Sequence, residues 1–278
     1  MSSLPKITII TPSFNQGSFI TQTIQSILGQ GYPNLEYIVM DGGSTDGTLE
    51  ILHHYENQLT WYSEKDRGQA HAVNKGLELV SGEVLGFVNS DDTLEPGALI
   101  KVGEFFAAHP EANWLSGRCR IVDKNGLEIR KMVTRYKNFF LALANYRILF
   151  VLNYISQPAT FWRRKITEEF GLFDESDPYT FDYEFWLRIG KRYKLFTRPD
   201  YFANFRVHSK SKSFNPSNNQ YEQFEYQLRM AGRHTSSKFL LGLQVFHNRL
   251  TVFLYKYLFS IKKNPIHRKM DGEELTVE

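Results

Sequence analysis

Cysteine and long apolar runs are the two features that this sequence most clearly lacks. The chain of 278 residues contains one cysteine, Cys119, which excludes an intramolecular disulfide. No stretch approaches the roughly 18 uninterrupted apolar residues of a membrane-spanning helix. The opening residues, MSSLPKITIITP, show neither the charged nor the apolar region of a signal peptide. We therefore expect a cytosolic protein from a reducing compartment.

A strong excess of one charge is also missing. The 33 Lys and Arg residues nearly balance the 30 Asp and Glu residues, which leaves a net charge of +3. So small an excess gives no reason to expect a nucleic-acid partner. The composition is 42% hydrophobic and 15% aromatic, and the length suits one elaborated globular domain or a catalytic domain with a smaller appendage.

The first half alternates β-rich runs with helical patterns, which predicts an α/β fold. The expected strands are KITIITPSF, LEYIVMDGG, LTWYSEK and EVLGFVNS, and the expected helices cover residues 18–30, 48–55, 69–80 and 96–109. Each strand is followed by a polar cluster. In open α/β sheets ligands bind at that carboxyl edge, so we expect the site there.

The second half is more aromatic and less regular. WLSGRCRIVDKNGLEIR predicts a hairpin that turns at residues 124–126, QPATFWR predicts a strand and FDYEFWLRIGKRY a helix. A strand pair is expected around KLFTRPDYFANFRVH. Residues 226–270 contain no Asp or Glu but many basic and aromatic residues, which predicts one or two basic amphipathic helices. These helices either contact a membrane surface or pack on the catalytic domain with their basic residues outward.

Two acidic segments follow predicted strands. In IVMDGGSTDGT, Asp41 ends a strand and could accept a base N–H, although Asp-Gly-Gly is also ordinary turn chemistry; Asp46 suits capping of the next helix. In GFVNSDDTLEPG, the paired Asp91 and Asp92 suit a hard divalent cation such as Mn²⁺ or Mg²⁺, which prefers oxygen ligands. Asp91 is the expected metal ligand, and Asp92 is expected to cap the helix that begins near Pro96.

Four blocks, TPSFN, IVMDGGSTDGT, SEKDRGQAHAVNKGL and GFVNSDDTL, occur in this order. Together they resemble the inverting family 2 nucleotide-sugar glycosyltransferases, over about residues 5–210. The resemblance implies a GT-A-type fold, a Rossmann-like mixed sheet flanked by helices. We expect a catalytic domain at 1–215, with a nucleotide-sugar-binding half at 1–110 and an acceptor-binding half at 111–215, and a C-terminal helical extension at 216–278.

The resemblance also implies site residues on the donor side. The predicted donor-binding residues are Thr11, Pro12, Ser13, Asn15, Asp41, Lys65, Asp66, Gly68, Asn74, Asn89 and Ser90. Arg67 is either a further contact to the pyrophosphate or a solvated surface charge. The family usually has Asp where this chain has Asn89, and that departure puts the ribose contact in question while it leaves Asp91 in register.

On the acceptor side the resemblance implies a catalytic base. Asp182 matches its position, although Phe181 stands where Glu is frequent, and Glu184 is the second candidate. The alternative is that Asp182 caps the helix that it precedes. The segment YFANFRVHSKSKS resembles the family's Arg-x-His segment, so Arg206 or His208 could close over the diphosphate or complete the metal shell, with His208 the expected metal ligand of the two. The alternative for His208 is a buried histidine with satisfied hydrogen bonds. Residues 209–219 would suit a lid that orders on donor binding.

The implied reaction moves a single sugar from a nucleotide-diphosphate sugar to the hydroxyl of a glycan or lipid-linked acceptor, in bacterial-type surface glycan synthesis. We expect a Mn²⁺ or Mg²⁺ cofactor, no nucleic acid, and possible peripheral contact with the cytoplasmic face of the membrane. Two alternatives stay open: a nucleotidyltransferase, and a degenerate sugar-nucleotide-binding module without catalysis.

Overall fold

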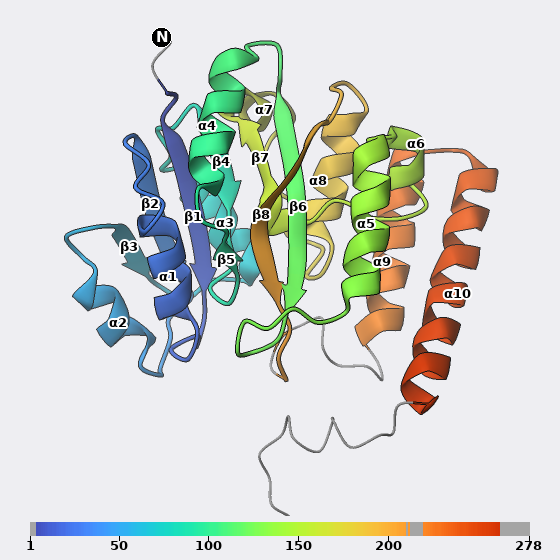
Figure 1. The fold of residues 1–278 in the computed structure, drawn as a ribbon, viewed down its shortest axis with the longest axis horizontal. Helices are drawn as coiled ribbons and strands as arrows, with labels where there is room; N and C mark the ends of the chain where they lie inside the picture. The colour runs from blue at the N-terminus through green and yellow to red at the C-terminus, as the bar shows by residue number, and fades with distance from the viewer. Residues whose placement is uncertain (1–3, 210, 212–218, 262–278) are drawn as a thin grey trace, which may run out of the picture.

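One mixed sheet organises the molecule. The computed structural model describes residues 4–209, 211 and 219–261, and within them the sheet has eight strands in the order β3-β2-β1-β4-β7-β6-β8-β5 (Figure 1). The strands are β1 (Ile7–Ser13), β2 (Leu35–Asp41), β3 (Thr60–Ser63), β4 (Val84–Phe87), β5 (Thr93–Leu94), β6 (Trp114–Val122), β7 (Thr160–Arg163) and β8 (Phe196–Arg206). Strands β3, β2, β1 and β4 are parallel, whereas β7 is antiparallel to β4 and β6. The expected mixed α/β fold is confirmed.

Helices follow the strands as the sequence pattern predicts. They are α1 (Ile20–Leu28), α2 (Thr48–His54), α3 (Gln69–Leu77), α4 (Ala98–Ala108), α5 (Lys131–Leu143), α6 (Tyr146–Leu149), α7 (Arg164–Phe170), α8 (Phe181–Gly190), α9 (Asn219–His234) and α10 (Lys238–Ile261). A short 3₁₀ turn, η1 (Gln157–Ala159), precedes β7. The four helices expected in the first half are all present, each slightly shorter than its pattern.

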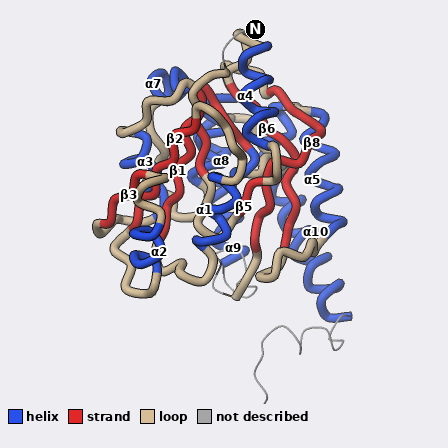
Figure 2. Tube along the Cα trace, turned by 60° about the vertical axis from the view of Figure 1, so that its left-hand side comes forward, coloured by secondary structure: helices blue, strands red, loops and turns tan. Residues whose placement is uncertain are grey.

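Both faces of the sheet are covered by helices, because successive strand residues point to opposite sides. In β2, Tyr37 and Val39 pack with α1, α2 and α4, whereas Ile38 and Met40 pack with α3 and the helices of the second half. Figure 2 shows the sheet between these two layers. The burial of both faces explains why every residue of β1 and β4 is buried and no exposed residue alternates along either strand.

The second half departs from expectation in two places. The expected strand pair near residue 200 is one strand, β8, which pairs with β6 and β5. Pro199 is tolerated because it lies at a register shift between β6 and β8, where a proline costs no ladder hydrogen bond. The expected hairpin after β6 has its tight turn, with Gly126 at φ +82°, but its return arm forms only a single bridge, Val122 to Glu128.

The C-terminal helices pack beside the second half. Met230 and Ala231 of α9 are buried in the same core cluster as α8, and α10 packs against α9. No described helix is long and apolar enough to cross a bilayer. The predicted boundary at residue 215 lies among residues 212–218, outside the described part of the chain, and so does most of the predicted lid at 209–219. The domain boundaries remain predictions.

Candidate active site

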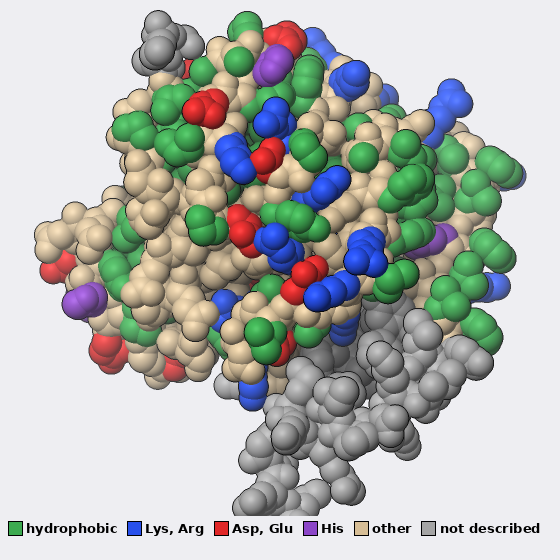
Figure 3. Space-filling view, in the orientation of Figure 1, with side chains coloured by type: hydrophobic (Ala, Val, Ile, Leu, Met, Phe, Trp, Pro, Cys, Tyr) green, Lys and Arg blue, Asp and Glu red, His purple; other side chains and the backbone are tan. Residues whose placement is uncertain are grey.

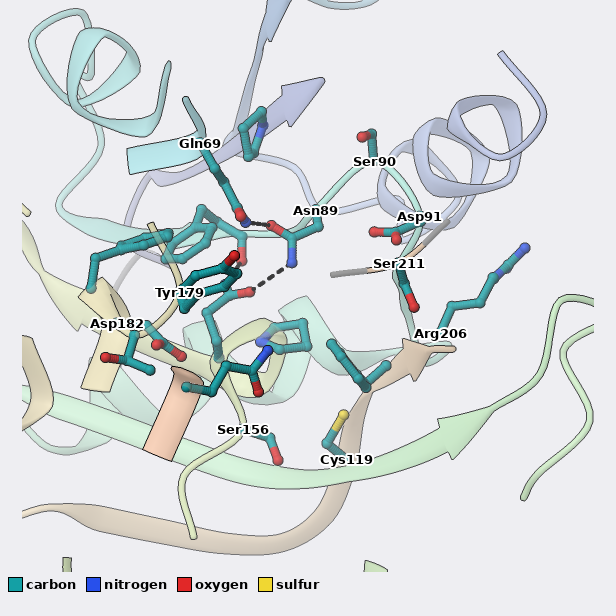
Figure 4. Close-up of a pocket in the computed structure, with 18 of the residues that line it drawn as sticks. Gln69, Asn89, Ser90, Asp91, Cys119, Ser156, Tyr179, Asp182, Arg206 and Ser211 are labelled. Carbon is teal, nitrogen blue, oxygen red and sulfur yellow. Dashed lines mark hydrogen bonds between the residues drawn. The ribbon is translucent and has the colours of Figure 1, made fainter. Parts of the chain in front are cut away.

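A cleft of about 690 Å³ opens at the carboxyl ends of β1 and β4, the edge at which the site was expected (Figure 4). Helices α3, α5 and α8 and the end of β8 complete its walls. The predicted site residues that line it are Pro12, Ser13, Asp66, Gly68, Asn89, Ser90, Asp91 and Asp182, together with Arg206. The predicted residues outside its lining are Thr11, Asn15, Asp41, Lys65, Asn74 and His208. These six lie behind or beside the cleft.

Asp41 organises the loop after β2. Its Oδ2 accepts hydrogen bonds from the backbone N–H of Gly43 (3.0 Å) and Ser44 (2.9 Å) and from the hydroxyl of Ser63 (2.7 Å), and Oδ1 accepts one from the Ser44 hydroxyl. The side chain is buried. Asp41 therefore shapes the turn that the glycines allow, and its contact with a donor base remains a prediction.

Two neighbouring loops are joined to this turn. Asn15, at φ +52°, accepts a hydrogen bond from the Thr45 N–H with its Oδ1 (2.8 Å), which fastens the end of β1 to the loop after β2. Asp66 lies so close over Gly42 that a Cβ at Gly42 would meet its Oδ2 at 2.5 Å. Gly42 thus lets the Asp66 carboxylate line the cleft. Thr11 is buried and bonds to Tyr37 (Oγ1 to Oη, 3.1 Å).

The polar residues around α3 have separate roles. Asn74 is buried and bonds to both backbone groups of Phe173: its Nδ2 donates to the carbonyl (3.0 Å) and its Oδ1 accepts from the N–H (2.9 Å). Arg67 donates to Glu175 (2.6 Å), and its side chain is 70% exposed, so it is an ion-paired surface charge outside the cleft lining. Lys65 is exposed beside Gly43. Asn74 and Arg67 hold the segment before α8 against α3.

Asn89 lies at the centre of an amide network on the cleft floor (Figure 4). Its Oδ1 accepts a hydrogen bond from Gln69 (2.5 Å), and its Nδ2 donates to Asp92 (3.2 Å) and Gln157 (3.4 Å). A carboxylate at this position would face Asp92 and could not donate. The departure from the family pattern therefore fits the neighbours of this residue.

Asp92 is structural, but in a different way from the one expected. It is fully buried, and its Oδ1 accepts the backbone N–H of Arg206 (2.8 Å), which fastens the acidic motif to the end of β8. The predicted capping of α4 is wrong, because Gly97 occupies the N-cap position and no side chain bonds there. Burial and the neighbouring Asp91 carboxylate raise the pKa of Asp92 well above its ordinary value.

Asp91 and His208 form the best candidate for a metal site. Asp91 Oδ2 and His208 Nε2 lie 3.0 Å apart, although 117 residues separate them. This distance is the length of a hydrogen bond between the two side chains. Two adjacent ligands at about 2.1 Å from an octahedral Mg²⁺ lie about 3.0 Å from each other, so an ion could replace this hydrogen bond without moving the pair apart. The described residues contain no group of three or more acidic, His or Cys side chains that could hold a metal. The remaining ligands would then be donor phosphates and water, as is common for Mg²⁺.

Asp182 lies on the opposite side of the cleft from Asp91 (Figure 4). It belongs to the first turn of α8, where its Oδ1 accepts the N–H of the next residue, Tyr183 (2.7 Å). Thr180 occupies the N-cap position without a capping side-chain bond, so Asp182 does not cap the helix. Burial raises its pKa to about 6, and the nearby ammonium of Lys137 opposes that rise. Burial lowers the pKa of Lys137 in turn. A carboxyl with a pKa near neutral suits proton transfer.

Glu184, the second candidate for the base, is excluded by its contacts. It is buried outside the cleft, and it accepts hydrogen bonds from Arg188 (2.9 Å) and from His234 of α9 (3.0 Å). Two residues after Asp182, its side chain points to a different side of α8. Glu184 therefore fastens α8 to α9.

Several cleft residues were missed by the sequence reasoning. They are Phe14, Gln69, Lys137, Gln157 and Tyr179, with Thr134 and Asn153. Phe14 is exposed at the mouth of the cleft. It directly follows the predicted Ser13 in the sequence, and that adjacency could have identified it as a site residue. Lys137 and Thr134 belong to α5, which carries no recognisable motif.

Three polar atoms near the cleft are buried without hydrogen-bond partners among the described residues: Thr134 Oγ1, Asn153 Oδ1 and Ser13 Oγ. Polar atoms of a ligand could satisfy them.

Comparison with known proteins gives a consistent result. The sequence model described as Glycosyl transferase family 2 matches residues 8–171, more than half of the chain. The PGL/p-HBAD biosynthesis glycosyltransferase of Mycobacterium bovis is 30% identical over 207 residues, which cover 70% of this chain and 73% of that protein. The putative teichuronic acid biosynthesis glycosyltransferase TuaG of Bacillus subtilis is 40% identical over 105 residues, 36% of this chain and 42% of TuaG. The chain thus matches less than half of the length of TuaG.

Solved structures share the fold. The mannosyltransferase PcManGT from Pyrobaculum calidifontis, in complex with GDP-Man and Mn²⁺, aligns with a TM-score of 0.68 at 19% identity, over 94% of this chain and 75% of that one. TarS 1–349 from S. aureus, in complex with UDP-GlcNAc, aligns with a TM-score of 0.65 at 19% identity, over 95% and 77%. The expected GT-A fold is confirmed. With the family match over residues 8–171, the chain belongs to glycosyl transferase family 2 and is a glycosyltransferase.

Proposed function

We propose that this chain is an inverting, metal-dependent glycosyltransferase that moves one sugar from a nucleotide-diphosphate sugar to an acceptor hydroxyl in cell-surface glycan synthesis. The observation that carries the proposal is the placement of Asp182, with a pKa raised to about 6, across one cleft from Asp91. The structural relatives are complexes with UDP-GlcNAc and GDP-Man, which supports a nucleotide-sugar donor. The names of two relatives, the teichuronic acid biosynthesis glycosyltransferase TuaG and a chondroitin synthase of Escherichia coli, support a role in the synthesis of cell-surface glycans.

The chemistry needs a base, because an acceptor hydroxyl is a poor nucleophile until its proton is removed. In the proposed step Asp182 takes that proton while the acceptor oxygen forms a bond to the anomeric carbon and the nucleoside diphosphate leaves from the opposite face. One in-line displacement inverts the anomeric centre. General-base assistance contributes about 10²–10⁴ in rate.

The carboxylates of the cleft support a single displacement. Among the described lining residues they are Asp66, Asp91 and Asp182. Asp91 is paired with His208, and Asp66 accepts the N–H of Gly68 (2.8 Å) on the donor side. Asp182 is thus the carboxylate placed for acceptor activation, and a second carboxylate that could form a covalent intermediate beside it is absent from the described lining.

Asp91 and His208 would hold Mn²⁺ or Mg²⁺. When bound, such an ion neutralises charge that develops on the diphosphate leaving group. The mannosyltransferase relative contains Mn²⁺, which supports this cofactor. The donor base would lie toward the ends of β1 and β2, near Pro12, Ser13 and Asp41, and the diphosphate near Asp66, Gly68 and Ser90. Cytosolic location and the absence of a nucleic-acid partner remain part of the proposal.

A donor screen tests the function. Purified chain is incubated with UDP-, GDP- and dTDP-sugars and Mn²⁺ or Mg²⁺, and released nucleoside diphosphate is measured for wild type, Asp91→Ala and His208→Gln. We expect metal-dependent release from one class of donor, with weaker donor binding in both variants. Release of pyrophosphate instead would indicate a nucleotidyltransferase, and donor binding without any release under all conditions would favour a non-catalytic module. Activity unchanged by both EDTA and Asp91→Ala would refute the metal proposal.

A further inference from the structure

Helix α10 is apolar on its exposed side as well as on the side that it packs. The packed side carries Leu240, Leu241 and Val252 together with the buried Gln244 and Asn248. On the other side Phe239 and Phe246 are 73% and 65% exposed, and Leu243 and Leu250 continue the same exposed stripe at helical spacing. A surface helix of a water-soluble protein normally has a polar exposed side. The exposed side of α10 therefore has the apolar composition of a helix face that contacts another molecule or surface.

A second apolar stripe lies on α5. Met132, Tyr136, Phe139 and Leu143, spaced at i, i+4, i+7 and i+11, are all exposed. The two stripes belong to neighbouring helices, because Tyr136 Oη lies 3.1 Å from Nε2 of His247 on α10 and their rings are parallel. We call these eight side chains of α5 and α10 the α5/α10 face. In Figure 3 hydrophobic side chains gather over these helices, with a His between them.

The charge around the α5/α10 face has one sign. Residues 129–167 and 226–270 contain no Asp or Glu. Lys131 and Arg135 on α5 and Lys238 and Arg249 on α10 are exposed, and none makes an ion pair with another described residue. Large exposed aromatics with flanking basic residues are the composition of interfacial helices that lie in the surface of a bilayer.

We propose that the α5/α10 face docks on the surface of an anionic lipid bilayer. The apolar side chains enter the boundary between headgroups and acyl chains, and the four basic residues meet the negative lipid headgroups. A second copy of the chain is a poorer occupant, because a two-fold contact would bring the same basic residues of both copies together without acidic partners.

Docking there would set the orientation of the cleft. Helix α5 contributes to both surfaces: Val133, Thr134 and Lys137 line the cleft, while Met132 and Tyr136 on the same turns lie in the exposed stripe. The acceptor side of the cleft would then be next to the bilayer. This step rests on the proposed transferase function, and it identifies the acceptor class as a hydroxyl carried on a lipid.

Vesicle flotation tests the docking without any sugar substrate. The full chain is mixed with vesicles of phosphatidylcholine alone or of phosphatidylcholine with about 30–40% phosphatidylglycerol, at low and at high salt. Comparison of the two lipid mixtures separates electrostatic binding from apolar insertion. We compare wild type with Phe239→Ser/Phe246→Ser, with Met132→Gln/Phe139→Gln and with Arg135→Gln/Arg249→Gln. The control is Leu79→Gln/Leu127→Gln, which removes two exposed leucines outside the face. Circular dichroism and donor hydrolysis verify that each variant is folded.

We expect salt-sensitive binding of wild type and of the control to anionic vesicles only. Each apolar double variant should bind at least about tenfold more weakly, since each buried aromatic or Met side chain contributes substantially. Loss of each Arg should weaken binding about fivefold. Donor-dependent release of nucleoside diphosphate should be unchanged, so a failure of docking and a failure of the transferase proposal are distinguishable.

Three outcomes would overturn the inference. The first is wild-type binding no stronger than that of the Phe239→Ser/Phe246→Ser variant. The second is a dimer in sedimentation velocity that the same variant converts to a monomer, which would assign the face to a second copy. The third is vesicle binding that appears only after removal of residues 262–278, which would assign the face to that segment of the chain itself.

Discussion

The donor side and the acceptor side of the cleft are built differently. On the donor side, Asp41, Asp66 and Asn89 have their polar atoms engaged by hydrogen bonds to nearby loops and side chains. On the acceptor side, Asp182 and Lys137 are defined by burial, which moves the pKa of each toward neutrality. In the proposed reaction the donor side would therefore work through fixed geometry and the acceptor side through tuned protonation. Substitutions on the two sides should fail in different ways.

The largest effect should come from Asp182→Asn. Without the carboxylate the acceptor hydroxyl keeps its proton, so acceptor-dependent turnover should fall about 10²–10⁴-fold. Donor affinity, measured by calorimetry, should change little because Asp182 lies away from the donor loops. Glu184→Gln is the matched control on the same helix and should lower the melting temperature with kcat retained. Full turnover in Asp182→Asn would remove it as the base.

Asn74→Leu tests the hydrogen bonds by which α3, on the donor side, holds the segment before α8, on the acceptor side. This nearly isosteric change leaves both backbone groups of Phe173 without partners in a buried site, at a cost of about 1–3 kcal/mol each. Urea denaturation should show the free energy of unfolding lowered by about 2–4 kcal/mol. Glu78→Ala, exposed at the end of α3, should stay within about 0.5 kcal/mol of wild type. Equal losses in both variants would contradict the assigned role of Asn74.

The tuned protonation of the acceptor side is tested by pH. Asp182 acts as a base only when ionised, so kcat/KM should rise with pH through about 6 and reach about half of its plateau there. The Lys137 ammonium lowers the pKa of Asp182. Lys137→Met should therefore raise that pKa and move the acid limb of the profile to higher pH. A limb that stays in place would show that Lys137 does not act on Asp182.

The smallest effect should come from the fixed geometry of the donor side. In Gly42→Ala the added Cβ must displace the Asp66 carboxylate, because its Oδ2 would lie at 2.5 Å. We expect donor affinity to fall a fewfold, with little change in stability, since the flexible end of one side chain moves. Gly47→Ala, where a Cβ meets open space, is the control. Identical donor affinities in the two variants would mean that Asp66 does not contact the donor.

Most of the fold could be predicted from sequence because its signals are local. Short β-rich runs with polar clusters at their ends predicted β1, β2, β4 and the edge that holds the cleft. The predicted strand pair near residue 200 was wrong, because β8 is one strand that continues past Pro199, and the register shift that accommodates this proline arises only from pairing with β6. The predicted hairpin after β6 forms its turn but not a paired return strand, because β6 is already paired on both sides by β7 and β8.

The sequence by itself determined the strands and helices of the first half, the sheet edge at which the cleft opens, and that Asp91 and Asp182 belong to separate segments. Only the tertiary structure decided that Asp91 pairs with His208, that Lys137 approaches Asp182, and that Glu184 bonds to His234 of α9. Local propensity and periodicity act over a few residues, whereas these contacts join residues about 45 to 117 positions apart, and their geometry follows from packing. The exposed apolar stripe of α10 was also decided by the tertiary structure, because the side that a helix buries depends on its neighbours.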